Sequence, residues 1–234
     1  MPTNLPSNLH VSKHPCLRAK LSQLRSSNAG SRETQRLIHE ITTIIACEAL
    51  ADNLSVTAAG EGSTPLGHTY AVEKVTPENV ALIPILRSGL SMVEPLLAVL
   101  PEAVPIYHLG LFREKTTLQP VEYYNNLPET GTKDSPPTAS LAIILDPVIA
   151  TGGTVTAAIQ TLTEWGVEKI LVVNVLGSTV GLKRAATEAA VGNDGKGVEL
   201  QVWTGAVDLE LDEKGMIVPG IGDIGDRLFL ALGK

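Results

Sequence analysis

The chain has 234 residues, of which 44% are hydrophobic and 18% are charged, and its formal net charge is -7. This length suits one large domain, and the acidic balance argues against non-specific binding of nucleic acid. Two cysteines are too few for a disulfide framework or a zinc site. No apolar run approaches the ~20 residues that a membrane helix needs, and the first residues lack a signal-peptide pattern. We therefore expect a soluble, cytoplasmic protein with neither a nucleic-acid nor a membrane partner.

The first third of the chain gives three expectations. Residues 1–30 are polar and rich in Pro, Ser and Asn, which predicts a partly ordered N-terminal arm before a single domain over residues 31–234. From Ser31 to about Asp52, apolar residues recur at helical spacing with charged residues between them, which predicts an amphipathic helix. Residues 53–79 contain the turn-rich stretch GEGSTPLG and indicate short strands or loops.

From residue 80 onward, strand-like and helix-like segments alternate. The expected strands are Val80–Leu86, 104–112, Leu141–Leu145, 170–176 and 198–203, and the expected helices are 88–100, 154–165 and 179–190. Continuously apolar strands that alternate with helices are typical of a parallel sheet covered on both faces. The expected fold class is therefore α/β, with a doubly wound, mainly parallel sheet flanked by helices. Ligands bind such sheets beyond the carboxyl ends of the strands.

Residues 113–140 interrupt this alternation. They are polar and turn-rich, yet they contain the adjacent tyrosines Tyr123 and Tyr124. Loops of this length inside a compact domain are usually functional or disordered. We interpret the segment as a projecting β-hairpin, called the hood below, which covers the site and has a mobile tip near residues 131–137.

The strongest chemical signal is the segment LAIILDPVIATGGT at residues 141–154. An apolar strand ends at Asp146, and a glycine pair precedes a helix. Gly152 and Gly153 allow positive φ and close approach of the backbone, and the N–H groups at a helix start attract anions. Thr151 and Thr154 add hydroxyl donors. No lysine follows the glycines, so this is not a Walker A loop. The pattern predicts a phosphate-monoester site, with an ordinary strand-to-helix turn as the alternative.

Residues 145–154 resemble the phosphoribosyl-diphosphate (PRPP) loop of type I phosphoribosyltransferases. The single acid at Asp146 is more narrowly similar to that of uracil phosphoribosyltransferases. Three further segments resemble this family in the expected order: the pyrophosphate loop at 83–89, the hood at 111–128 and the C-terminal uracil loop within 216–227. The Lys-His-Pro at residues 13–15 also matches a family pattern, so the resemblance spans roughly residues 13 to 230.

The resemblance implies the reaction of uracil with PRPP to give UMP and pyrophosphate in pyrimidine salvage. It implies catalytic roles for Arg87 and Arg113, on the departing diphosphate, and for Asp146, at the ribose. The implied PRPP-binding residues are Arg87, Arg113, Asp146, Ala150, Thr151, Gly152, Gly153, Thr154 and Asp223. The implied uracil-binding residues are Ala150, Ile217, Gly222, Asp223 and Ile224. Magnesium is expected to be bound through PRPP and water, with Asp223 nearby, and not directly by the protein.

Three positions depart from the family pattern, namely Glu122, Met216 and Ile224, and the last two adjoin the expected base pocket. Two alternatives therefore stay open. One is a phosphoribosyltransferase for another base, such as a purine or orotate, and the other is a PRPP- or nucleotide-binding regulatory homologue with weak or no turnover. The resemblance further implies a homodimer or homotetramer. The N-terminal arm and the apolar face of the 31–52 helix are candidates for its interface, and a core role for that helix is the alternative. GTP activates some members, but no residue here is assigned to GTP.

Overall fold

The computed structural model describes residues 5–113, 120–129, 139–188 and 197–230. Its centre is an eight-stranded sheet with the order β1-β10-β9-β7-β4-β5-β6, in which β8 also pairs with β9. Every neighbouring pair is parallel except β5 with β6. The strands of this sheet are β1 (Leu9–Val11), β4 (Val80–Leu86), β5 (Leu109–Arg113), β6 (Pro120–Asn125), β7 (Leu141–Leu145), β8 (Val148–Ile149), β9 (Lys169–Ser178) and β10 (Glu199–Asp208).

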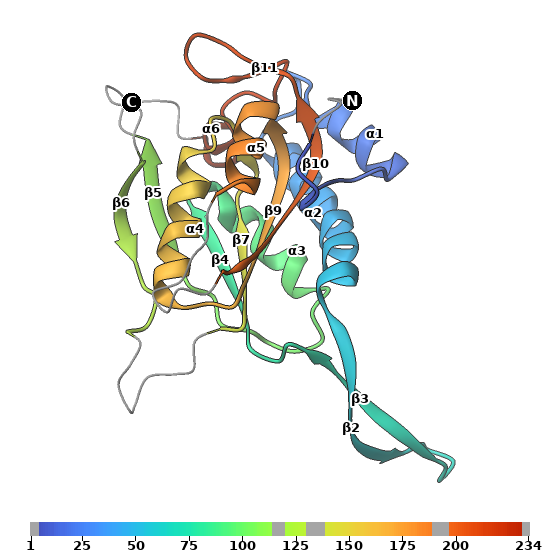
Figure 1. The fold of residues 1–234 in the computed structure, drawn as a ribbon. Helices are drawn as coiled ribbons and strands as arrows, with labels where there is room; N and C mark the ends of the chain where they lie inside the picture. The colour runs from blue at the N-terminus through green and yellow to red at the C-terminus, as the bar shows by residue number, and fades with distance from the viewer. Residues whose placement is uncertain (1–4, 114–119, 130–138, 189–196, 231–234) are drawn as a thin grey trace.

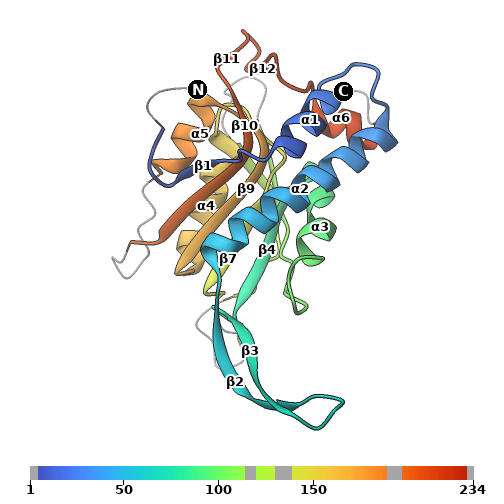
Figure 2. The same cartoon turned by 90° about the vertical axis from the view of Figure 1, so that its right-hand side faces the viewer.

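Helices cover both faces of the sheet, as Figures 1 and 2 show. One face carries α1 (Pro15–Leu24), α2 (Ser31–Asn53), the 3-10 helix η1 (Ser88–Met92), α3 (Val93–Leu97) and α6 (Ile224–Phe229). The other face carries α4 (Gly153–Trp165) and α5 (Thr179–Ala186). The α/β fold class that the sequence predicts is confirmed. Among the described residues, no helix combines the length and the apolar character that a bilayer crossing requires.

Two hydrophobic cores lie on opposite faces of the sheet. Successive side chains of a strand point to opposite faces. Strand β7 therefore gives Leu141, Ile143 and Leu145 to the core beneath α2, and Ala142 and Ile144 to the core beneath α4. All five are buried, which explains why this strand is a continuous apolar run.

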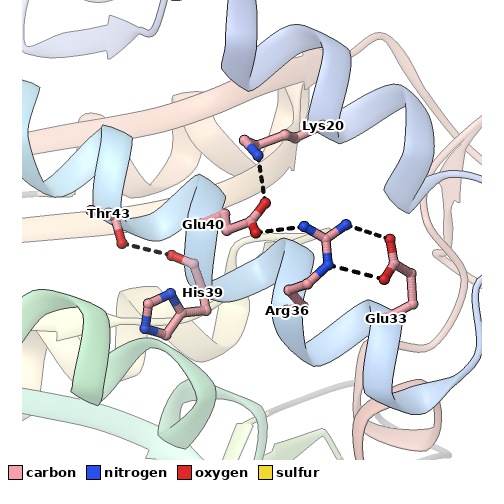
Figure 3. A network of polar contacts seen from close by, with 6 residues as sticks. All are labelled: Lys20, Glu33, Arg36, His39, Glu40 and Thr43. Carbon is pink, nitrogen blue, oxygen red and sulfur yellow. Dashed lines mark hydrogen bonds and ion pairs between the residues drawn. The ribbon is translucent and has the colours of Figure 1, made fainter.

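The N-terminal segment is more regular than the polar arm that the sequence suggests. Residues 9–11 add a parallel strand to the edge of β10. Helix α1 follows, with a proline at its start, and it buries Leu17, Leu21 and Leu24 against the core. Figure 3 shows how Lys20 of α1 reaches Glu40 of α2, with Nζ and Oε2 2.5 Å apart. Only three residues of α1 are buried, so its sequence looks polar although its inner face is not.

The apolar face of α2 is buried inside the protein, with Leu37, Ile38, Ile41 and Ile45 fully covered. Of the two roles that the sequence left open for this helix, it has the core role.

Two smaller pairs of strands complete the fold. Strands β2 (Ser55–Ser63) and β3 (Thr69–Thr76) form an antiparallel hairpin that projects from the body in Figures 1 and 2 and is largely exposed. The sequence indicated only short strands or loops here. Strands β11 (Glu210–Leu211) and β12 (Ile217–Val218) pair near the C-terminus.

The predicted hood is described in part. Strands β5 and β6 form the antiparallel pair at its base, with Arg113 opposite Pro120. The turn at 114–119 and the expected tip near 131–137 lie outside the described residues. Helix α5 ends at Ala186, earlier than the predicted 179–190 helix, and the last two residues of that prediction lie outside the described residues.

Candidate active site

Three chain segments meet at the carboxyl edge of the sheet. Asp146 follows β7, and the loop after β4 packs against the same strand end, because a Cβ on Gly89 would lie 2.3 Å from the carbonyl oxygen of Leu145. Arg87 is exposed in this loop, and the peptide bond that precedes it is cis. Its guanidinium carbon lies 5.9 Å from the ring centroid of Phe229 in α6. The predicted pyrophosphate loop, the strand end at Asp146 and the C-terminal segment are thus neighbours.

The segment after Asp146 has the geometry of an anion-binding loop. Gly152 is the N-cap of α4, with φ 80° and ψ -9°, a left-handed conformation that favours glycine. It has no side chain to cap the helix, which leaves the N–H groups of the first turn available to a ligand. Residues 146 and 148–155 line a cavity of about 100 Å³. The predicted phosphate-binding residues from Ala150 to Thr154 therefore lie around one cavity.

Helix α5 holds this loop in place through main-chain packing. The hydroxyl of Ser178 donates to the carbonyl oxygen of Ala150 at 2.5 Å and accepts from the N–H of Gly181 at 2.9 Å. A Cβ on Gly181 would lie 2.2 Å from that carbonyl oxygen, and one on Gly152 would lie 2.6 Å from the carbonyl oxygen of Gly181. Glycine is required on both sides of this contact because no side chain fits between the two backbones.

A buried polar network supports the strand end from behind. The amide of Asn174 donates to the carbonyl oxygens of Asp146 and Leu176 at 3.0 and 3.1 Å. The hydroxyl of Thr204 donates to the Asn174 side-chain oxygen at 2.7 Å. Buried polar groups are tolerated when their hydrogen bonds are made, and here they fix the backbone from which the Asp146 side chain projects.

The Asp146 carboxyl group is 8% exposed and has no cationic partner among the described residues. Its one recorded hydrogen bond is from the N–H of Val148 to Oδ1, at 3.4 Å. Burial disfavours the charged form and raises the pKa of Asp146 to about 7, although the backbone hydrogen bond acts in the opposite direction. The side chain can therefore exist as acid or carboxylate near neutral pH, and it can accept hydrogen bonds from ligand hydroxyls.

The predicted uracil loop combines buried side chains with exposed backbone. Ile217 and Ile224 are buried in the core beneath α2, so their side chains are not presented to a ligand. Gly222 is exposed and has φ 71°. Asp223 is also exposed, and as N-cap of α6 its Oδ1 accepts from the N–H of Asp226 at 3.1 Å. This arrangement suits recognition by main-chain groups.

Arg184 is a basic residue at this site that the sequence analysis did not single out. It lies in the last turn of α5, with Nη1 3.7 Å from the position that a Cβ on Gly153 would take. Its side chain is exposed, and its guanidinium has no hydrogen bond or ion pair within the described part of the chain. No local motif marks this position, because packing of α5 on the loop brings it there. The side chain of Arg113, by contrast, lies outside the described residues.

Comparisons with known proteins agree with this geometry. A family model described as "Uracil phosphoribosyltransferase" matches residues 11–231. The chain is 40% identical over 223 residues to a protein of Schizosaccharomyces pombe named "Putative uracil phosphoribosyltransferase urg2". This alignment covers 95% of this chain and 90% of urg2. It is 38% identical over 221 residues to the uracil phosphoribosyltransferase of Roseiflexus castenholzii, covering 94% and 96% of the two chains.

A solved structure shows the same overall arrangement. The AQ2163 protein from Aquifex aeolicus aligns with a TM-score of 0.81 at 30% identity, covering 95% of this chain and 98% of that one. The family match extends over nearly the entire sequence and includes the strand end, the glycine loop and the C-terminal segment that meet at the sheet edge. This chain belongs to the uracil phosphoribosyltransferase family.

Proposed function

We propose that the protein transfers the ribose 5-phosphate group of PRPP to uracil, which gives UMP and pyrophosphate in cytoplasmic pyrimidine salvage. The observation that carries the proposal is the Asp146–Thr154 segment, in which a buried strand end and a left-handed Gly152 precede the first turn of α4. The C-terminal loop within residues 216–227, which contains the exposed Gly222, lies at the same sheet edge. It supplies the site for uracil, the acceptor, beside the site for PRPP, the donor.

The 5′-phosphate is held by the loop from Ala150 to Thr154. Main-chain N–H groups at the helix start and the hydroxyls of Thr151 and Thr154 supply the donors. Arg184 adds a positive charge from α5, next to Gly153. Binding energy gained here is remote from the reacting carbon and positions C1 of the ribose for attack.

At the reacting centre, the bond from C1 to the diphosphate breaks and the bond from N1 of uracil to C1 forms. The proton of N1 passes to the released diphosphate. C1 gains oxocarbenium character, as in glycoside cleavage. Asp146 accepts hydrogen bonds from the ribose hydroxyls. Arg87 and Arg113 stabilise the charge that develops on the leaving diphosphate. The hood limits hydrolysis of PRPP by excluding water.

The residues present fit magnesium that arrives with the substrate. Among the described residues, no group of three or more His, Cys, Asp or Glu side chains could form a protein cage for a metal. Magnesium usually keeps several waters and binds substrate phosphates, so a single exposed carboxylate such as Asp223 is enough to contact its water shell. When bound, the ion offsets the negative charge of the diphosphate.

The main chain at Ile217 and Gly222 reads the edge of uracil, and Asp223 lies near the ribose. Met216 and Ile224 flank this base-binding stretch. The Ile224 side chain is buried in the core beneath α2, so it does not fill the space that a small pyrimidine needs. We propose a homodimer or homotetramer as the assembled form.

The test is UMP formation from uracil and PRPP with magnesium, comparing the wild type with Asp146→Asn. We expect UMP from the wild type and a rate about a hundredfold or more lower in the variant, because a positioned electrostatic contact is lost. Equal rates would remove Asp146 from the mechanism. A panel with hypoxanthine, adenine and orotate separates other bases. Tight PRPP binding without UMP would instead support a regulatory homologue.

A further inference from the structure

A pair of charged residues outside the donor site holds the main chain of the C-terminal loop. Arg25, directly after α1, donates from Nη1 and Nη2 to the two carboxylate oxygens of Asp208 at 2.8 and 2.7 Å. Nη1 also donates to the carbonyl oxygen of Gly220 at 2.7 Å, and the N–H of Gly220 donates to Asp208 at 2.9 Å. Both main-chain groups of Gly220 are thus fixed by this one ion pair.

The environment makes the pair strong and specific. The side chain of Asp208 is 8% exposed and that of Arg25 is 26% exposed. A two-pronged guanidinium–carboxylate contact fixes direction as well as distance, and loss of one partner leaves the other charge partly buried and unpaired. Gly220 needs such support because it has φ 63° and sits in a turn so tight that a Cβ would lie 2.1 Å from the Ile217 carbonyl oxygen.

A second arginine holds the next residue, Ile221, against the turn between α1 and α2. Nη1 of Arg227 donates to the carbonyl oxygens of Leu24 and Ile221, both at 2.7 Å, and Nη2 donates to that of Ser26 at 3.2 Å. The turn between α1 and α2 therefore holds the loop from Gly220 to Ile221 on both sides. Arg227 and Leu24 are 203 positions apart in the sequence.

We propose that Arg25 and Asp208 are positioning residues for the nucleobase acceptor. By fixing Gly220, which lies between Ile217 and Gly222, they set the main-chain groups of these two residues at the spacing that the uracil edge requires. This inference rests on the proposed function, in which the main chain of this loop reads the base. A reader made of main chain has no long side chain to compensate for a displaced backbone, so a shift of about 1 Å is costly.

The Arg25–Asp208 pair contacts the proposed uracil loop and not the proposed PRPP loop. Among the described residues, the polar contacts of the Arg25 side chain and the Asp208 carboxylate are with each other and with Gly220, and none is with the loop from Ala150 to Thr154. The hydroxyl of Thr179 in α5 does reach Asp208, but it donates to the main-chain oxygen at 3.3 Å, which Asp208→Asn leaves in place. Substitution of the pair is therefore expected to disturb uracil binding more than PRPP binding.

The experiment measures KM for uracil, KM for PRPP and kcat in Arg25→Met and Asp208→Asn. We expect KM for uracil to rise between about tenfold and a hundredfold, with KM for PRPP changed less than about twofold. The double variant is expected to be no worse than the more severe single variant, since both break one contact. The matched control is Arg36→Met, which removes an exposed, ion-paired arginine of α2 (Figure 3) and is expected to change neither constant.

A second readout is independent of turnover. Hydrogen exchange of amides in residues 216–223 is expected to speed up in both variants, while exchange in residues 146–156 stays as in the wild type. Arg25→Lys keeps the positive charge but loses the two-pronged guanidinium contact, and it replaces Arg25→Met in the test if that variant fails to fold. The KM for uracil of Arg25→Lys is expected to rise by less than that of Asp208→Asn.

An unchanged KM for uracil, or an equal rise in both Michaelis constants, would overturn the positioning role. A wild type that binds PRPP but makes no UMP would instead refute the proposed function.

Discussion

The carboxyl group of Asp146 is buried without a cationic partner among the described residues, and burial raises its pKa to about 7 from an ordinary 3.8. In the unfolded chain the group is ionised above about pH 4. Between pH 4 and 7 the folded state therefore binds more protons than the unfolded state, and stability falls as pH rises through this window. Above pH 7 the group is ionised in both states, and the folded state bears the full cost of desolvating the carboxylate. Where it is ionised, the buried Asp146 carboxylate therefore lowers the stability of the folded state.

The first prediction concerns Asp146→Asn. The amide has a similar shape and no charge to desolvate, so the variant gains stability over the wild type as the pH rises. We expect the difference in unfolding free energy between variant and wild type to grow by roughly 2–3 kcal/mol from pH 5 to pH 8. Urea titrations at both pH values measure it. A difference that stays the same at both pH values would contradict the assignment of a raised pKa.

The second prediction concerns Arg184, whose guanidinium lies beside the start of α4 without a partner in the described chain. Arg184→Met is expected to raise KM for PRPP about three- to tenfold, since an exposed charge-assisted contact to phosphate is lost. The effect is expected to shrink at high salt. Lys183→Met, one position earlier on α5, is the control. If both variants behave alike, the contribution is general electrostatics and not a contact made by Arg184.

At the scale of elements, the packing of α5 on the phosphate loop gives the third prediction. Helix propensity alone would let Gly181→Ala stabilise the protein by up to about 1 kcal/mol. The contact with Ala150 predicts the opposite sign, because the new Cβ would lie 2.2 Å from a carbonyl oxygen. We expect a loss of roughly 1–3 kcal/mol in stability and weaker PRPP binding. Gly197→Ala, which meets no atom within 4 Å, is the control for denaturation and binding measurements.

Elements with a continuous apolar run or a regular apolar face are the ones that the sequence predicts best. Strands β4 and β7 match their expected bounds because each is an apolar run with a polar residue on either side, and α2 ends within two residues of its expectation. Helix α1 was missed because only Leu17, Leu21 and Leu24 face the core. The hairpin of β2 and β3 lacks a buried face, so it gives no clear periodic signal.

The site divides in the same way. The loop from Asp146 to Thr154 is contiguous, so its chemistry is legible in one stretch of sequence. Arg25 and Asp208 are 183 positions apart, and no local sequence pattern around either residue indicates that they form a pair. Arg184 reaches the loop through helix packing alone. Long-range contacts of this kind depend on the fold as a whole, and a single sequence does not display them.

At the scale of the molecule, the sheet separates two hydrophobic cores and brings the working groups to one edge. The donor loop is fastened to α5 beside one core, through Ser178 and Gly181. The acceptor loop is fastened to the turn between α1 and α2 beside the other, through Arg25 and Arg227. The two halves of the proposed reaction are therefore anchored to different parts of the protein.

Gly220 and Ile221 are held against the turn between α1 and α2, and this has a consequence for how the choice of base can change. The stretch that we propose reads the base comes after β10, the last long strand. Among the described residues, the side chains that hold Gly220 and Ile221 are Arg25, Asp208 and Arg227, and none of them belongs to the proposed phosphate loop. On the proposed function, substitutions within this short stretch can alter the choice of heterocycle while the scaffold that handles the activated sugar keeps its own, separate supports.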